Sequence, residues 1–212
     1  MRSDAERTEA RARSRSAAQA EAQSANIPVV MIRPDLSNIP QFPLPEGFTW
    51  RYFRDGDEDL WVSIEAEVAD FSGEEAARER FAWEHRPFRR ELERRCLFLM
   101  APGGRCAGTI MAWYNTPRTG GYCGRIHWVA LRTEFQGRRL AKPLMTLAMN
   151  RMAELHGGAY LTTQTRSLRA IKVYLDFGFE PIIVRNTCHR AWRLAAEALD
   201  VPALQDYRTD DG

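Results

Sequence analysis

The stretch EFQGRRLAKPL, residues 134–144, decides how the second half of the chain folds. Apolar residues recur through and after it at steps of three and four, which predicts one face of an amphipathic helix. Pro143 has no N–H group and fits only in the first turn, so we expect the helix to begin near Leu140. The N–H groups of residues 137–142 would then point outward and form a cradle for phosphate oxygens. The apolar positions are Leu140, Leu144, Leu147, Ala148, Met152 and Leu155.

Three cations, Arg138, Arg139 and Lys142, stand at this expected helix start. A cation at an exposed helix N-terminus opposes the helix dipole by ~0.3–1 kcal/mol. These side chains could form an ordinary solvated helix face, but three of them in one turn favour an anionic ligand. Gly137 would keep a side chain out of the ligand's way.

Composition limits the classes of protein that the chain can belong to. The 212 residues are 44% hydrophobic and 27% charged, as in a soluble globular protein, and no apolar run approaches the ~20 residues of a membrane span. The net charge of +2 argues against a nucleic-acid partner. The four cysteines form no C-x-x-C pair, so we expect no metal site, reduced thiols and a cytoplasmic protein.

Composition also divides the chain into four parts. Residues 1–26 carry no apolar stripe, so we expect a disordered arm or a frayed helix, and no targeting role because acids are interspersed. Residues 27–47 hold five of the eleven prolines and predict an extended lead-in. Residues 48–185 are the expected domain, and residues 186–212 a C-terminal helix and tail.

Periodicity and turn residues within the domain predict a mixed class, α+β or α/β, with a central sheet. The first half is expected to be antiparallel, and the second half to be strand–helix–strand. Asp55 and Glu58 have the spacing of a capping box, and Ser167 can cap a later helix. The expected strands are 48–57, 96–100, 105–114, 124–131, 159–165 and 179–184, with a turn at 115–121; the expected helices are 55–71, 74–94 broken near Pro87, the part of 136–156 that starts near Leu140, 167–178 and 191–207.

Two motifs resemble the signatures of the GNAT superfamily of N-acetyltransferases. The first is [R/Q]-x-x-G-x-[G/A] between a strand and a helix, and the second is Asn-x-x-Ala-x-x-Leu-Tyr-x-x-x-Gly-Phe. SLRAIKVYLDFGF, residues 167–179, follows the second, with Ser167 in place of asparagine and Tyr174 in register. Arg139 stands where the first motif usually has glycine; we expect a helical conformation there, which costs little. The first motif is filled by Gln136, Gly137, Arg138, Arg139, Leu140 and Ala141.

The resemblance implies a fold and a cosubstrate. The fold would be a mostly antiparallel central sheet of about six to seven strands flanked by helices. The cosubstrate would be acetyl-CoA, with coenzyme A as product and no metal. The strand before the first motif would splay from its neighbour and bind the pantetheine arm through its backbone. The implied cofactor residues are Val129, Ala130, Leu131, residues 136–142, Ser167 and Tyr174.

Acetyl transfer to an amine needs a base for the amine and an acid for the departing thiolate. Tyr174 matches the family's tyrosine near the sulfur and is the expected acid, although it also lies on an apolar helix stripe. His127 is the candidate base, because an imidazole titrates near neutral pH. A structural role for this histidine is the alternative. Other candidates for the base are Glu65, Glu67 and Asp70 on the helix expected at 55–71.

The predicted function is therefore transfer of an acetyl group from acetyl-CoA to a primary amine, directly in a ternary complex. Acidic residues and the aromatic side chains of Trp61, Phe71, Trp83 and Trp113 suggest a cationic small-molecule or peptide acceptor. No membrane partner is expected, and a homodimer is compatible with the sequence. The alternatives are a non-catalytic acyl-CoA-binding regulatory module and an acyltransferase for a protein or an aminoacyl-tRNA.

Overall fold

The computed structural model describes residues 4–115 and 123–208. The predicted turn at 115–121 lies, apart from Asn115, outside them. The chain forms two compact units, one made of residues 34–159 and the other of residues 1–33 with 160–212. No described helix has the length and apolar character that crossing a membrane requires.

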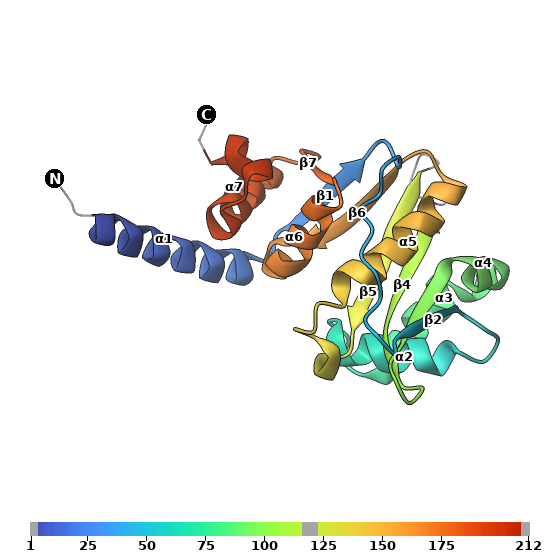
Figure 1. The fold of residues 1–212 in the computed structure, drawn as a ribbon. Coiled ribbons are helices and arrows are strands. Elements are labelled where there is room, and N and C mark those ends of the chain that lie inside the picture. The colour runs from blue at the N-terminus through green and yellow to red at the C-terminus, as the bar shows by residue number, and fades with distance from the viewer. Residues whose placement is uncertain (1–3, 116–122, 209–212) are drawn as a thin grey trace. The chain divides into compact units, whose positions relative to one another are not determined.

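The unit of residues 34–159 holds four antiparallel strands in the order β2-β3-β4-β5. Helices α2–α4 precede β3, and α5 follows β5 (Figure 1). The break expected near Pro87 is a short 3-10 helix, η1, over Arg86–Phe88. The other bounds are β2 Thr49–Tyr52, α2 Glu58–Val68, α3 Glu74–Glu84, α4 Arg89–Arg95, β3 Cys96–Met100, β4 Cys106–Tyr114, β5 Gly124–Leu131, η2 Thr133–Phe135 and α5 Ala141–Leu155.

Side chains on the two faces of these strands enter two apolar layers. Phe98 and Met111 belong to a core with Trp61 of α2 and Phe81 of α3. The alternate residues of β3 and β4 point the other way, where α5 covers the strands with buried leucine, alanine and methionine side chains. The α5 stripe predicted from the sequence is therefore the face that holds this helix on the sheet.

The other unit holds three strands in the order β6-β1-β7, with β1 antiparallel to β7. Strand β1 lies within the predicted extended lead-in and was not predicted as a strand. Pro28 stands at its first residue, where a proline is tolerated. The bounds are α1 Asp4–Ala25, β1 Pro28–Arg33, β6 Ala159–Gln164, η3 Thr165–Ser167, α6 Leu168–Asp176, β7 Glu180–Ile182, α7 Thr187–Leu199 and η4 Pro202–Tyr207.

The N-terminal arm differs from the disorder expected for residues 1–26. Helix α1 packs against α7, with Ala18 and Ala22 buried. Arg15 donates hydrogen bonds to the carbonyl groups of Ala198 and Leu199 at the end of α7. The burial of small alanine side chains and the hydrogen bonds to the end of α7 both depend on tertiary contacts. A search of the sequence for apolar stripes does not detect such contacts. The predicted domain boundaries stay predictions.

In the part of the chain that the structure describes, seven mostly antiparallel strands and their flanking helices confirm the predicted fold class. The capping box predicted at Asp55 and Glu58 is wrong, and the cap predicted at Ser167 is confirmed in position only. Asp57, rather than Asp55, is the N-cap residue of α2: its carbonyl accepts the Trp61 N–H, while Arg51 and the N–H of Arg54 hold its carboxylate. Ser167 is the N-cap residue of α6, but its side chain makes no capping hydrogen bond.

Candidate functional site

Strand β5 contains a bulge immediately before the residues predicted to bind pantetheine. Thr109 of β4 pairs with Ala130, whereas Met111 pairs with His127. Two steps along β4 therefore match three along β5, so one residue of β5 is extra. Trp128 has φ +48°, a left-handed conformation that is rare for a bulky side chain. A bulge disrupts the strand pairing locally and redirects the adjacent side chains, here His127 and Trp128.

The turn between β5 and α5 is the segment predicted to hold an anion. Helix α5 begins at Ala141 with Leu140 as N-cap, and Leu144 N–H is bonded to the Leu140 carbonyl. Pro143 therefore lies in the first turn, as predicted. Gly137 has φ +75°, and a Cβ atom added to it would enter open space. Left-handed residues in such a turn bring successive N–H groups toward one point, where an anion can bind.

Arg139 corrects the expectation of a right-handed helical conformation. Its φ is +60°, in the left-handed region that glycine adopts without steric cost. The motif usually has glycine at this position, and the backbone of Arg139 has a φ that suits glycine better than arginine. The neighbouring cations lie over aromatic rings: Arg138 over Phe135 at 5.2 Å, and Lys142 over Phe42 at 4.8 Å, each measured to the ring centroid.

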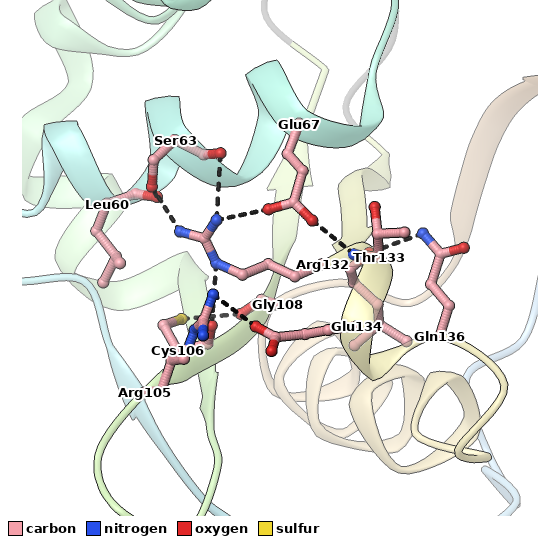
Figure 2. Close-up of polar contacts among 11 residues, drawn as sticks. Leu60, Ser63, Glu67, Arg105, Cys106, Gly108, Arg132, Thr133, Glu134 and Gln136 are labelled. Carbon is pink, nitrogen blue, oxygen red and sulfur yellow. Dashed lines mark hydrogen bonds and ion pairs between the residues drawn. The ribbon is translucent and has the colours of Figure 1, made fainter.

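Arg132 fixes the segment that joins the bulged strand to this turn (Figure 2). Its guanidinium donates to the Glu67 carboxylate at 2.7 Å, to the Ser63 hydroxyl at 2.7 Å and to the Cys106 carbonyl at 3.2 Å. The second Glu67 oxygen accepts the Thr133 N–H at 2.7 Å. These bonds join the end of β5 to α2 and to β4, so the backbone is held in place where the turn before α5 begins.

Gln136 and Glu67 therefore have structural partners. Gln136 donates its side-chain amide to the Leu131 carbonyl at 3.0 Å, which closes the loop on the strand. Burial alone would raise the pKa of Glu67, but the hydrogen bonds from Thr133 and Arg132 lower it. A carboxylate held in this way is a poor proton acceptor, which counts against Glu67 as the base.

His127 makes a close contact with Glu84, the last residue of α3. The distance from His127 Nε2 to Glu84 Oε1 is 2.5 Å, and Arg125 lies 3.9 Å from the same oxygen. Burial alone would raise the pKa of Glu84, but the hydrogen bond from His127 and the nearby positive charges lower it to about 2. Burial lowers the pKa of His127, and the bond to Glu84 partly offsets this effect. Glu84 is therefore ionised at pH 7, and burial favours the neutral form of His127.

An aromatic box surrounds His85, the residue after Glu84. Its ring centroid lies 5.8 Å from that of Trp61, 5.0 Å from that of Trp113 and 6.0 Å from that of His127. His85 is fully buried, and neither ring nitrogen has a hydrogen-bond partner in the described part of the chain. Burial lowers the pKa of His85 to about 3, so the ring is neutral.

Among the residues that the structure describes, Glu84, His85 and His127 have donor atoms that could hold a metal ion, since these atoms lie within 4.8 Å of one another. The hydrogen bond between Glu84 and His127 already uses one donor atom from each. The Arg125 guanidinium beside Glu84 would repel a cation. We therefore interpret the group as a hydrogen-bonded pair beside a buried histidine.

The aromatic residues predicted for the acceptor site divide into two groups. Trp61 and Trp113 are buried in the core. Phe71 and Trp83 line an open depression together with Ala76, Glu79 and Arg80. The ring of Phe71 stacks on that of Trp128 at 5.8 Å between centroids, so this depression lies beside the bulge of β5.

Ser167 and Tyr174 belong to the other unit, where Tyr174 is buried on α6 and its ring contacts Phe179. Burial raises the pKa of Tyr174 to about 12, so the hydroxyl keeps its proton at neutral pH. The remaining predicted residues all lie in the unit of residues 34–159. Along the chain they run from His127 through the end of β5 and the turn to the start of α5.

The chain belongs to the acetyltransferase (GNAT) family, because the family model matches residues 58–179, more than half of the chain. The match includes both motifs, the bulged strand and the cradle. A comparison with curated proteins found no match.

Solved structures share the fold. A GCN5-related N-acetyltransferase from Sphaerobacter thermophilus is 22% identical, with a TM-score of 0.56 over 73% of this chain and 48% of that chain. An acetyltransferase of the GNAT family from Colwellia psychrerythraea is 12% identical, with a TM-score of 0.53 over 74% and 53%. A GCN5-related N-acetyltransferase from Kribbella flavida is 17% identical, with a TM-score of 0.50 over 73% and 54%. This chain thus spans about half the length of these proteins.

Proposed function

We propose that the protein transfers an acetyl group from acetyl-CoA to a primary amine by direct attack in a ternary complex. Family membership supports acetyl transfer in general. The observation that carries the proposal is the bulged strand β5 leading into the left-handed turn at the start of α5. The N–H groups at a helix start suit the pyrophosphate of a coenzyme A derivative, and the cations add charge. Acetyl-CoA supplies the thioester that is attacked.

In this proposal each part of the cofactor has its own set of residues. The backbone of Val129, Ala130 and Leu131 would bind the pantetheine arm, and residues 136–142 the pyrophosphate. Ser167 and Tyr174 are included in the proposed cofactor site because they match positions of the second motif. Tyr174 would protonate the departing thiolate, and His127 would take the proton of the amine.

The amine would reach His127 from the depression lined by Phe71 and Trp83. The depression holds a carboxylate, Glu79, and a guanidinium, Arg80, which lies 5.6 Å from the centroid of the Trp83 ring, so a cationic amine would compete with Arg80 for that ring. A small-molecule or peptide amine with a positive charge is the acceptor that we propose. The cytoplasmic location and a homodimer stay predictions.

Thermal melting with and without acetyl-CoA tests the cradle. A ligand of the native state must raise the melting temperature, and no shift at a millimolar concentration would count against the proposal. Gly137→Val should weaken this shift sharply, because the side chain would fill the space of the pyrophosphate. Gly103→Val is the matched control: Gly103 has φ +84° and equally open surroundings, but lies in the turn between β3 and β4.

Turnover separates the enzyme from the non-catalytic alternative. Release of coenzyme A would be followed with an arylalkylamine, an aliphatic diamine, an amino sugar and a lysine-containing peptide. Transfer to a small amine supports the proposal. Acetyl-CoA binding without transfer to any acceptor favours the regulatory module, and transfer to the peptide alone favours a protein acyltransferase.

A further inference from the structure

The contact between α3 and β5 determines which nitrogen of His127 carries a proton. An ionised carboxylate has acceptors only, so Glu84 Oε1 accepts a hydrogen bond and His127 Nε2 must donate it. A neutral imidazole has a single N–H. When His127 is neutral, its free electron pair is therefore on Nδ1.

We propose that Glu84 is a positioning residue for deprotonation of the acceptor amine, because it holds His127 with the proton on Nε2 and leaves Nδ1 as the base. This inference rests on the proposed acetyl transfer. The acceptor ammonium first loses one proton to solvent; the neutral amine nitrogen then forms a bond to the acetyl carbonyl carbon and gives a second proton to Nδ1. The carbon–sulfur bond breaks, its electron pair goes to sulfur, and Tyr174 supplies the proton that completes the thiol.

The carboxylate has a second effect, on the imidazolium that forms during the step. With both ring nitrogens protonated, His127 carries a positive charge directly against Glu84, while Arg125 and Arg80 oppose that charge. His85, the remaining titratable group beside it, is neutral. Glu84 is thus the group that stabilises the charged ring in a buried place, and it raises the basicity of Nδ1.

Nitrogen NMR of the ¹⁵N-histidine protein and a pH profile of kcat/KM test the proposal. In the wild type, His127 should show one neutral form, protonated on Nε2. Glu84→Gln keeps the size of the side chain and removes its charge, so the pKa of His127 should fall by about one unit or more. The acidic limb of kcat/KM should move to lower pH by the same amount. Glu75→Gln, an exposed charge at the start of the same helix, should change neither.

Three results would overturn the proposal. One is a wild-type His127 that is protonated on Nδ1 when neutral, which can be observed even if Glu84→Gln does not fold. Another is an unchanged His127 pKa in Glu84→Gln. The third is a shifted pKa with an unshifted kcat/KM profile, because the base would then be another group. Absence of any wild-type turnover would instead contradict the proposed function, and NMR would still report on the pair.

Discussion

At its C-terminal end, β5 continues into Arg132, whose guanidinium finds acceptors on Glu67, Ser63 and Cys106. Near the bulge of the same strand, polar groups in the described residues lack such partners: both ring nitrogens of His85 and the indole N–H of Trp128 are buried and unbonded. Buried polar groups are normally hydrogen-bonded, so the second region carries a cost in stability that the first does not.

The difference indicates separate roles for the two regions. The hydrogen bonds of Arg132 with Glu67, Ser63 and Cys106, which we call the frame, fix the backbone that leads to the turn before α5. The unsatisfied region holds the ionised Glu84 and His127 in a desolvated place, where charges and proton affinities are shifted. Such shifts gather at functional sites. Substitutions in each region should therefore affect different measurements.

The largest effect is expected from His127→Gln. If His127 is the base, turnover should fall by ~10²–10⁴, while acetyl-CoA affinity changes little, because the interaction is made in the transition state. Kinetics at saturating acetyl-CoA and a binding titration separate the two quantities. Turnover within threefold of the wild type would leave the base role without support.

Glu65 of α2 tests the cost of buried polar groups. Its Oε1 has no partner among the described residues, and burial raises its pKa to about 8. Between about pH 4.5 and pH 8 the unfolded chain loses this proton while the folded protein keeps it, so stability should fall as the pH rises. Glu65→Gln should remove this dependence and raise the free energy of unfolding near pH 8 by roughly 3–5 kcal/mol, at most. Urea melts at pH 5 and pH 8 measure the free energy of unfolding of both proteins. An equal change in this free energy between the two pH values in wild type and variant would contradict the prediction.

The frame should respond differently, with a moderate loss of both stability and affinity. Arg132→Met keeps an unbranched stem but leaves the Glu67 carboxylate without its cation. We expect a loss of about 1–3 kcal/mol in the free energy of unfolding, because hydrogen bonds to charged groups are removed. Acetyl-CoA should bind more weakly, and the pKa of His127 should not move. A shifted His127 titration would show that the two regions are coupled.

The sequence predictions were most accurate where the chemistry of a single residue restricts the backbone, as at the start of α5. Pro143 can occupy few places in a helix, so the start of α5 was predictable to within a residue. A local rule was also sufficient in the sheet. Leu97 and Phe98 are consecutive residues of a strand, so alternation alone assigns their side chains to opposite faces.

What the sequence could not predict depends on contacts between distant residues. Nothing near Glu84 in the sequence indicates that it meets His127, 43 residues later and on another element. The bulge at Trp128 depends on the register with β4, and its bulky side chain gives no local signal of a left-handed backbone. The burial of Ala22 in α1 likewise depends on the chain folding back against α7.

The smallest effect separates backbone from charge within the cradle. A left-handed conformation costs a non-glycine residue roughly 1–2 kcal/mol, and glycine avoids this at a cost of about 0.5–1 kcal/mol in unfolded-state entropy. Arg139→Gly should therefore raise the free energy of unfolding by up to about 1 kcal/mol. An exposed ion pair contributes about 1 kcal/mol or less, so acetyl-CoA affinity should stay within about tenfold.

Arg138→Gly removes the same charge from the adjacent position, where φ is not positive, and also removes the contact with Phe135. It should lower the melting temperature, whereas Arg139→Gly should raise it. If both variants melt lower than the wild type, the left-handed backbone at Arg139 carries no penalty. If Arg139→Gly alone loses acetyl-CoA binding by far more than tenfold, the guanidinium rather than the backbone holds the phosphate. The opposite signs expected for two neighbouring arginines make this comparison independent of net charge.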